Sequence, residues 1–113
     1  MNLNQLLSAA SASVLWNHPD PFPVPDVSRV VASDLMSDVL ATDLDRPLLL
    51  TSLLSDHALR TAHVVGAAAV LVANGKNPPP EMVDLARELG IPLARTPLSK
   101  FDASVALGKA LGL

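Results

Sequence analysis

The feature that most constrains the fold is an alternation that begins at residue 29. Short apolar runs alternate with stretches in which apolar residues recur at helical spacing. Because strand and helix alternate with short turns, the strands must pair in parallel through right-handed crossovers. The sequence therefore predicts an α/β fold, a small three-layer sandwich on a mostly parallel sheet of about four to five strands. The expected strands from this region are 29–32, 47–51, 68–73 and 91–95.

Residues typical of helix ends separate these strands. Ser33 is expected to be the N-cap of a helix whose buried stripe includes Leu35, Met36, Val39 and Leu40. Ser55 or Asp56 is expected to cap the next helix, whose stripe is Ala58, Leu59, Ala62 and Val65. Capping therefore supports the strand and helix assignment independently of the apolar pattern.

The carboxyl-terminal half has similar signals. Gly66 and Gly90 are each expected to end a helix, as glycine does at the C′ position. The prolines 78–80 are expected in a first helical turn. Pro92 indicates that its strand lies at an edge or begins there. Ser99–Asp102 is expected to form a capping box, with Asp in place of Glu, at the start of a last helix.

The amino-terminal residues predict a short helix, a short strand and a stiff connection. Apolar residues at 3, 6, 7 and 10 have helical spacing, and residues 13–16 suit a strand. Four prolines follow within residues 19–25, which forbid a helix and a sheet interior. A fixed crossing over the surface is favoured over a proline-rich ligand for another domain, and the sequence leaves both open.

The composition excludes several classes of protein. A chain of 113 residues suits a single domain, 1–113. The absence of cysteine excludes disulfides, thiol nucleophiles and thiolate metal sites, and fits a cytoplasmic setting. A net charge of −3 and three aromatic residues disfavour nucleic-acid binding. The apolar stretch at 64–73 is too short to span a membrane, and we expect no signal peptide.

Polar residues follow each expected parallel strand. In open α/β sheets ligands bind beyond the carboxyl ends of the strands, next to helix N-termini with free backbone N–H groups. We therefore expect an anion-binding rim, with Lys76 and Arg95 as its charges, although caps and turns alone also require such residues. The candidate ligand-binding residues are Ser33, Asp34, Ser37, Asp38, Thr51, Asn74, Gly75, Lys76, Arg95, Thr96 and Ser99.

Asp34 and Asp38 are one helical turn apart, which predicts an acidic and hydroxylic helix face. Two carboxylates are used in this way at magnesium sites, usually with phosphates as the other ligands. A solvated face or a dimer contact is favoured over a metal site, because two carboxylates alone hold a metal poorly. We predict neither a metal nor another cofactor.

No catalytic motif is present in the sequence. The chain lacks H-E-x-x-H, G-x-S-x-G, the phosphate-binding loop pattern G-x-x-x-x-G-K-[ST] and G-x-G-x-x-G. Without a motif for a nucleophile, a metal or a nucleotide, the sequence favours binding over catalysis.

Two segments resemble DRTGG domains. Residues 30–41, V-V-A-S-D-L-M-S-D-V-L-A, resemble the segment that opens the core of that family. Residues 88–93, E-L-G-I-P-L, and 96–99, T-P-L-S, resemble its closing stretch. With the opening helix and strand, the resemblance covers nearly the whole chain. Where the family often has Thr-Gly-Gly after the third strand, this chain has Asn74-Gly75-Lys76.

The resemblance implies a module that regulates or dimerises and has no activity of its own. DRTGG domains occur alone or with CBS-domain pyrophosphatases and phosphotransacetylases, and are similar to the N-terminal domain of HPr kinase/phosphorylase. The positions that match their motifs are Ser33, Asp34, Ser37, Asp38, Thr96 and Ser99. The replacement of a glycine by Lys76 reduces backbone freedom and adds a charge. If this turn binds a ligand in relatives, the ligand here would differ or be absent.

Three functions remain open at this point. The first is a homodimeric regulatory module that senses a nucleotide or another small anion. The second is a dimerising adaptor that binds a protein partner and no small molecule, which a mean hydropathy of +0.37 favours. The third and least favoured is a magnesium-dependent phosphate-handling enzyme that uses Asp34 and Asp38.

Overall fold

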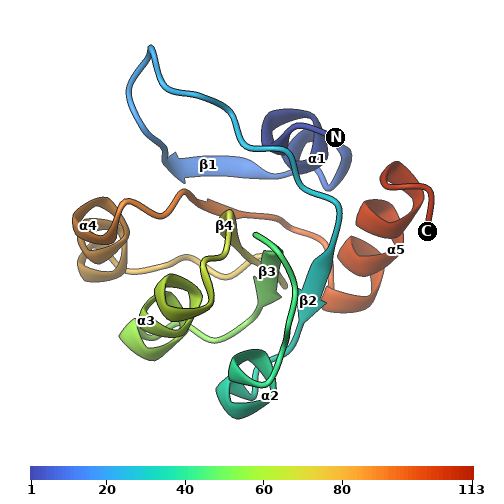
Figure 1. Ribbon diagram of the computed structural model, residues 1–113. Helices are drawn as coiled ribbons and strands as arrows, with labels where there is room; N and C mark the ends of the chain where they lie inside the picture. The colour runs from blue at the N-terminus through green and yellow to red at the C-terminus, as the bar shows by residue number, and fades with distance from the viewer.

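The computed structural model, which describes residues 1–113, has five strands in one sheet (Figure 1). Their order across the sheet is β1-β5-β4-β3-β2. The four strands from β2 to β5 are parallel, and β1 pairs with β5 in the antiparallel sense. The prediction of a mostly parallel sheet is thus confirmed. The strands are β1 (Ser13–Trp16), β2 (Val30–Ala32), β3 (Leu48–Thr51), β4 (Ala69–Val72) and β5 (Leu93–Arg95).

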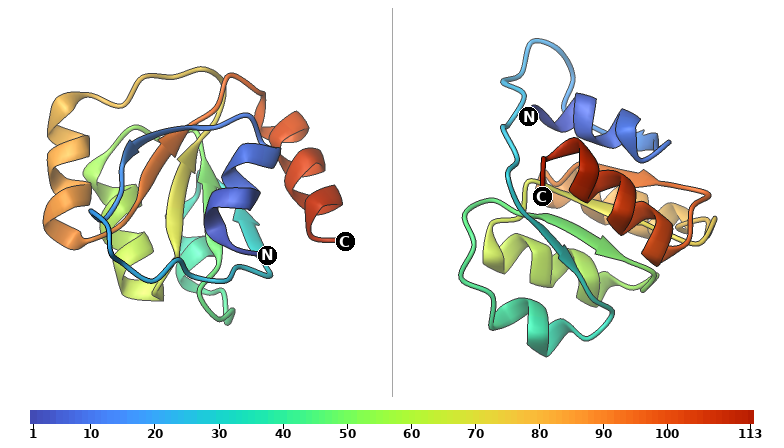
Figure 2. Two further views of the ribbon diagram at one scale, coloured as in Figure 1. Left: turned by 90° about the horizontal axis from the view of Figure 1, so that it is seen from above. Right: turned by 90° about the vertical axis from the view of Figure 1, so that its right-hand side faces the viewer.

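Five helices cover the two faces of the sheet (Figure 2). Each crossover from β2 to β5 is right-handed and steps in the same direction, so α2, α3 and α4 lie together on one face. The other two helices, α1 and α5, cover the opposite face, which completes the predicted three-layer sandwich. The helices are α1 (Leu3–Ala9), α2 (Met36–Leu40), α3 (Asp56–Val65), α4 (Pro80–Leu89) and α5 (Lys100–Ala110). None of them combines the length and the apolar character needed to cross a membrane.

The central strands are apolar because helices cover both of their faces. Leu48 and Leu50 of β3 pack in the core beneath α1 and α5, while Leu49 packs in the core beneath α2, α3 and α4. All three side chains are buried. Alternate residues of one strand thus serve two cores, which explains why this strand is a continuous apolar run.

Most of the expected helix ends are confirmed. Gly66 and Gly90 follow α3 and α4 with φ +71°, the left-handed conformation that favours glycine. Pro80 is the first residue of α4. The Ser99 hydroxyl accepts a hydrogen bond from the backbone N–H of Asp102 at 3.0 Å and so caps α5.

The start of α2 differs from the prediction. The N-cap position is Leu35, and the helix is only five residues long. The Ser33 hydroxyl instead accepts a hydrogen bond from the backbone N–H of Leu35 at 3.0 Å, which closes a local turn before the helix. Met36 and Val39 are buried, whereas Leu35 and Leu40 are exposed. Ser33 is therefore a turn residue and not the N-cap.

Pro92 immediately precedes β5, which confirms one of its two expected positions. The strand is not an edge strand, because β1 pairs along its free side. The Pro92 carbonyl accepts a hydrogen bond from the backbone N–H of Val70 at 2.9 Å. Proline has no backbone N–H to donate, and the start of the β4–β5 hydrogen-bond ladder tolerates this because the Pro92 carbonyl still accepts a bond there.

The connection between β1 and β2 crosses the surface and packs on the domain. Two backbone hydrogen bonds hold the end of the connection that leads into β2. The N–H of Leu3 donates to the Pro25 carbonyl at 2.9 Å, and the N–H of Val27 donates to the Met1 carbonyl at 2.8 Å. The His18 ring bonds to the Gly90 carbonyl at 2.9 Å near its other end. This agrees with the expected stiff surface crossing.

Candidate functional site

The carboxyl ends of the four parallel strands meet at one edge of the sheet (Figure 2). Polar side chains follow these strands, as the sequence predicts, and α5 adds one more at its first residue. We call this region the carboxyl edge and define it by Asp34, Thr51, Ser52, Lys76, Arg95 and Lys100.

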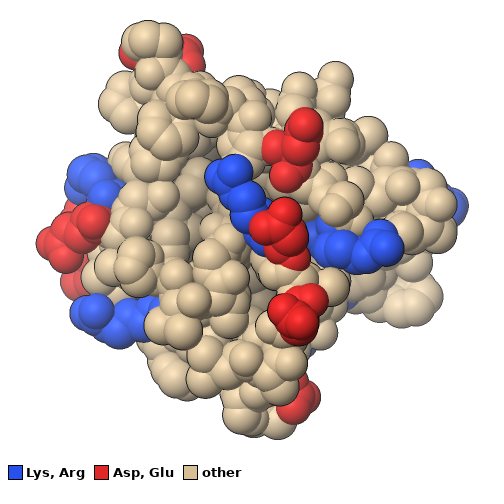
Figure 3. Space-filling view, viewed as in Figure 1, with Lys and Arg blue, Asp and Glu red and all other residues tan.

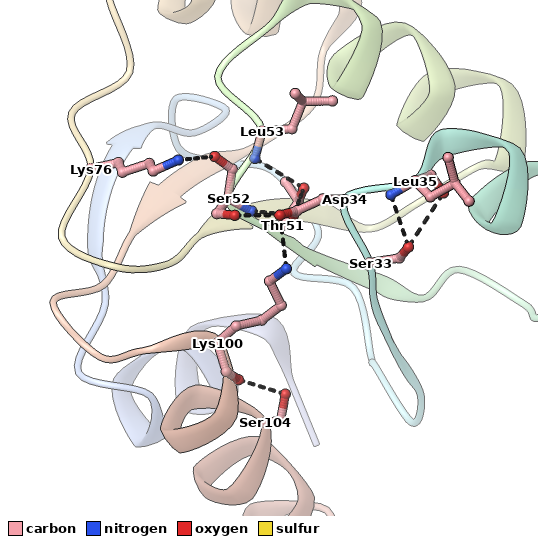
Figure 4. A network of polar contacts seen from close by, with 9 residues as sticks. All are labelled: Ser33, Asp34, Leu35, Thr51, Ser52, Leu53, Lys76, Lys100 and Ser104. Carbon is pink, nitrogen blue, oxygen red and sulfur yellow. Dashed lines mark hydrogen bonds and ion pairs between the residues drawn. The ribbon is translucent and has the colours of Figure 1, made fainter.

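Asp34 lies at the centre of a polar network at the carboxyl edge (Figure 4). One carboxylate oxygen accepts hydrogen bonds from the Thr51 hydroxyl at 2.9 Å and from the backbone N–H of Ser52 at 2.7 Å. The other accepts from the Ser52 hydroxyl and forms an ion pair with Lys100 at 2.8 Å. The carboxylate therefore joins β2, β3 and α5.

This environment favours the charged form of Asp34. Burial raises the pKa of the carboxyl group, but the hydrogen bonds from Lys100, Ser52 and Thr51 outweigh burial and hold the pKa well below its ordinary value of 3.8. Asp34 is thus a carboxylate at every physiological pH. It can accept hydrogen bonds but cannot act as a general acid near neutrality.

The remaining two cationic side chains of the carboxyl edge bind backbone carbonyl groups. Lys76 donates to the Ser52 carbonyl at 2.9 Å (Figure 4). Arg95 donates to the Gly75 carbonyl at 2.8 Å and to the Lys76 carbonyl at 3.0 Å. These bonds tie the turn after β4 to β5 and to the turn after β3.

The backbone N–H groups expected to receive an anion at the turn after β4 are already bonded. Those of Asn74 and Gly75 donate to the Leu98 and Thr96 carbonyls at 2.8 and 2.9 Å. The expectation of free amides at this turn is therefore wrong, because the turn pairs with the chain after β5. At this turn, the side chains are the remaining donors for an anion.

Two further candidate residues have structural roles. The buried hydroxyl of Thr96 donates to the Ala10 carbonyl at 2.6 Å and accepts from the backbone N–H of Leu98 at 3.2 Å. Ser99 caps α5. Both side chains are thus used within the fold.

Asp34 and Asp38 do not share a helix face, contrary to the prediction. Asp34 precedes α2 and bonds to residues of β3 and α5, whereas Ser37 and Asp38 lie exposed on α2 without a side-chain hydrogen bond. No group of three or more His, Asp or Glu side chains is placed to hold a metal ion. A magnesium ligand role for Asp34 would require displacement of donors that already occupy both of its oxygens.

Ser52 and Lys100 belong to this site but are not among the candidate ligand-binding residues. The sequence places Ser52 directly after Thr51 at the end of a buried strand, which is the signal that points to it. Lys100 stands inside the predicted capping box, but its partner depends on where α5 packs. Local sequence contains no sign of that placement.

Known proteins share the fold of this chain but not a closely related sequence. No family model matches the sequence, and no curated protein matches it. A solved structure of the CBS and DRTGG domains of the regulatory region of Clostridium perfringens pyrophosphatase, complexed with the activator diadenosine tetraphosphate, is similar in structure. The match has a TM-score of 0.72 at 20% identity and covers 94% of this chain but only 45% of that chain. The shared fold agrees with the resemblance to DRTGG domains.

Proposed function

We propose that this domain is a regulatory module, without catalytic activity of its own, that senses a nucleotide or another small anion at the carboxyl edge. The observation that carries the proposal is the convergence of Lys76, Arg95 and Lys100 there, from three different segments of the chain. Lysine and arginine side chains are the usual partners of phosphate groups.

The bonds that these cations make within the protein are weak enough to be exchanged. A hydrogen bond to a neutral backbone carbonyl stabilises a fold by about 1 kcal/mol, and a charged phosphate oxygen forms a stronger one. A phosphate that recruits Lys76 and Arg95 would release the Ser52 and Gly75 carbonyls. The turns after β3 and β4 would then shift relative to each other, which couples binding to conformation.

The solved structural relative supports the regulatory part of the proposal. That protein region is described as regulatory and is complexed with a nucleotide activator. The relative extends well beyond the part that matches this chain. The choice of nucleotides as the first ligands to test follows from this description.

Titration calorimetry with AMP, ATP and diadenosine tetraphosphate tests the binding site. We expect the variant Lys76→Gln/Arg95→Gln to weaken binding by about tenfold or more, because each tenfold corresponds to about 1.4 kcal/mol. Arg60→Gln is the matched control, because Arg60 is exposed on α3 and forms no ion pair. Absence of binding to the wild type at about 1 mM nucleotide would contradict the proposal. A site with a Kd above about 1 mM has a binding free energy of less than about 4 kcal/mol, which is too weak for a regulatory site.

We also propose that the module is a homodimer. Several large apolar side chains are exposed, among them Phe101 with 74% and Leu35 with 58% of its surface accessible. A second copy that covers such side chains would remove apolar area from water. Light scattering behind size exclusion, with and without nucleotide, measures the assembly. A dimer that changes its mass or elution with nucleotide supports a sensing module, and a monomer at high concentration contradicts dimerisation.

A protein-interaction adaptor is the second candidate, favoured by the same exposed apolar side chains. An adaptor would form a stable dimer or partner complex that no small molecule alters. Replacement of Phe101 by Ser would weaken that complex and leave the carboxyl edge intact, because the Phe101 side chain is exposed and lies outside the Asp34 network. Calorimetry and light scattering together therefore separate the two functions.

A further inference from the structure

A cavity of about 380 Å³ lies at the edge of the sheet opposite to the carboxyl edge. Its lining comes from the first turn of α1, the residues that lead into β4 and β5, and the connection between β1 and β2. The volume falls within the range of about 300 to 1,000 Å³ that is typical of small-molecule sites. Figures 1 and 3 view the molecule from this side, where charged side chains flank a hollowed, mostly uncharged area.

The wall of the cavity formed by the β1–β2 connection is held in place. The His18 ring bonds to the Gly90 carbonyl at 2.9 Å and meets the Trp16 ring edge-on, with ring centroids 4.8 Å apart. At the other end of the wall, the Pro25 carbonyl accepts a hydrogen bond from Leu3. Four prolines further restrict the connection. The cavity thus exists before a ligand binds, which reduces the entropic cost of binding.

An aromatic surface forms part of this wall. The rings of His18 and Phe22 are stacked, with centroids 3.7 Å apart and an interplanar angle of 9°. Both residues line the cavity, and Phe22 keeps 48% of its surface accessible. A planar ring that stacks on this pair would remove apolar area of Phe22 from water.

The charged groups of the lining define a second requirement. Arg46 lines the cavity and takes part in neither of the two ion pairs of the molecule, Arg87–Asp84 and Lys100–Asp34. A guanidinium group without a partner binds carboxylate or phosphate groups through two parallel hydrogen bonds. Asp20 supplies a carboxylate to the same lining and suits an N–H donor on the ring.

We propose that this cavity is a second ligand site, which binds a planar heteroaromatic compound with a single acidic group. The ring would stack on Phe22, and the acidic group would bind Arg46. An N–H of the ring system, either in the ring or on an exocyclic amino group, would donate to Asp20. The acidic group is a carboxylate or a phosphate monoester, because both match a guanidinium fork. None of the residues that define the carboxyl edge lines this cavity, so the site is separate from the one proposed above.

Two probes distinguish the two sources of the acidic group. Indole-3-acetate has a ring N–H and a carboxylate, and adenosine monophosphate has a heteroaromatic base and a phosphate. Indole and adenosine are their neutral counterparts. Each titration is followed by the NMR resonances of the backbone amides. We expect the acidic probe that fits the cavity to shift the resonances of Ala67, Gly90 and Arg46, which line the cavity. Shifts confined to the carboxyl edge for both probes would overturn the proposal.

Variants of the lining test the two contacts separately. We expect Arg46→Gln to weaken the acidic probe about tenfold and to leave its neutral counterpart unchanged, while Phe22→Ser weakens both. Arg46→Lys should retain part of the affinity. Arg29→Gln is the control, because Arg29 lies on the connection between β1 and β2 but does not line the cavity. Because Lys76→Gln/Arg95→Gln leaves this cavity intact, failure here is distinguishable from failure at the carboxyl edge. Absence of binding by both probes, or binding that neither lining variant alters, would overturn the proposal.

Discussion

Asp34 and Lys100 form an ion pair, with 2.8 Å between Oδ2 and Nζ, that bridges the two helical layers at the carboxyl edge. Asp34 leads from β2 into α2 on one face of the sheet, and Lys100 is the first residue of α5 on the other. Both side chains are partly accessible, with 42% and 32% of their surfaces exposed. Solvent therefore weakens the pair, and the neutral donors to Asp34 contribute comparably to stability.

A double-mutant cycle measures how much the pair contributes. We expect Asp34→Asn to lower the free energy of unfolding by about 1–2 kcal/mol, because an amide places N–H groups where the Ser52 and Lys100 donors require an oxygen. Lys100→Met should cost about 0.5 kcal/mol, and the coupling between the two changes should be about 0.5–1 kcal/mol. Urea unfolding gives all of these values. Asp38→Asn is the control, and a cost for it equal to that of Asp34→Asn would contradict this account.

The stability of the wild type should decline in acid partly through Asp34. Its pKa in the folded protein lies below the ordinary value of 3.8, so the folded state binds the proton less readily than the unfolded chain. The contribution of Asp34 is therefore fully present above about pH 5, and is lost as the pH falls below the unfolded value towards the folded one. The difference in unfolding free energy between wild type and Asp34→Asn should shrink below about pH 4. A difference that grows in acid would contradict the lowered pKa.

The alternation of strands and helices could be predicted because the physics is local. Leu48–Leu50 and the run ending at Val72 are apolar throughout since both faces are covered, and Gly66 and Gly90 end helices by a conformation that few other residues adopt. Boundaries shifted by a residue or two. β1 pairs with β5 in the antiparallel sense. The sequence predicts a mostly parallel sheet, but it does not identify β1 as the antiparallel strand.

The parts that could not be predicted depend on tertiary placement. A serine hydroxyl that accepts from an N–H two residues later closes a turn as readily as it caps a helix, so the pattern at Ser33 fits both. The Asp34–Lys100 pair exists only because α5 packs beside β2, and the cavity exists only because the proline-rich connection folds over Gly90. Neither packing arrangement leaves a periodic signal in the sequence.

Thr96 should matter for stability more than for binding. Its hydroxyl is buried, donates to the Ala10 carbonyl and accepts from Leu98, and so connects α1 to the chain after β5. Thr96→Val preserves the shape of the side chain but leaves a buried carbonyl without its donor, and we expect a cost of about 1–3 kcal/mol in urea unfolding. Thr42→Val removes a hydroxyl whose hydrogen bond to the Asp38 carbonyl is exposed, and it should cost less than about 0.5 kcal/mol. If the two variants lost the same unfolding free energy, the buried hydrogen bonds of the Thr96 hydroxyl would not contribute to stability.

Gly66 and Gly90 offer a matched pair that tests the wall of the cavity. Both have φ +71°, so replacement by Ala should destabilise each by about 1 kcal/mol through the left-handed conformation alone. A Cβ at Gly66 meets no atom within 4 Å, whereas a Cβ at Gly90 would lie 3.4 Å from Cε1 of His18. Gly90→Ala should therefore press on the His18 ring and shift it by a few tenths of an ångström, which alters the edge contact that His18 makes with Trp16. Because Trp16 is the only tryptophan, its fluorescence reports this displacement directly. We expect an altered emission in Gly90→Ala and wild-type emission in Gly66→Ala; unaltered emission in both would show that the wall tolerates the added methyl group without moving.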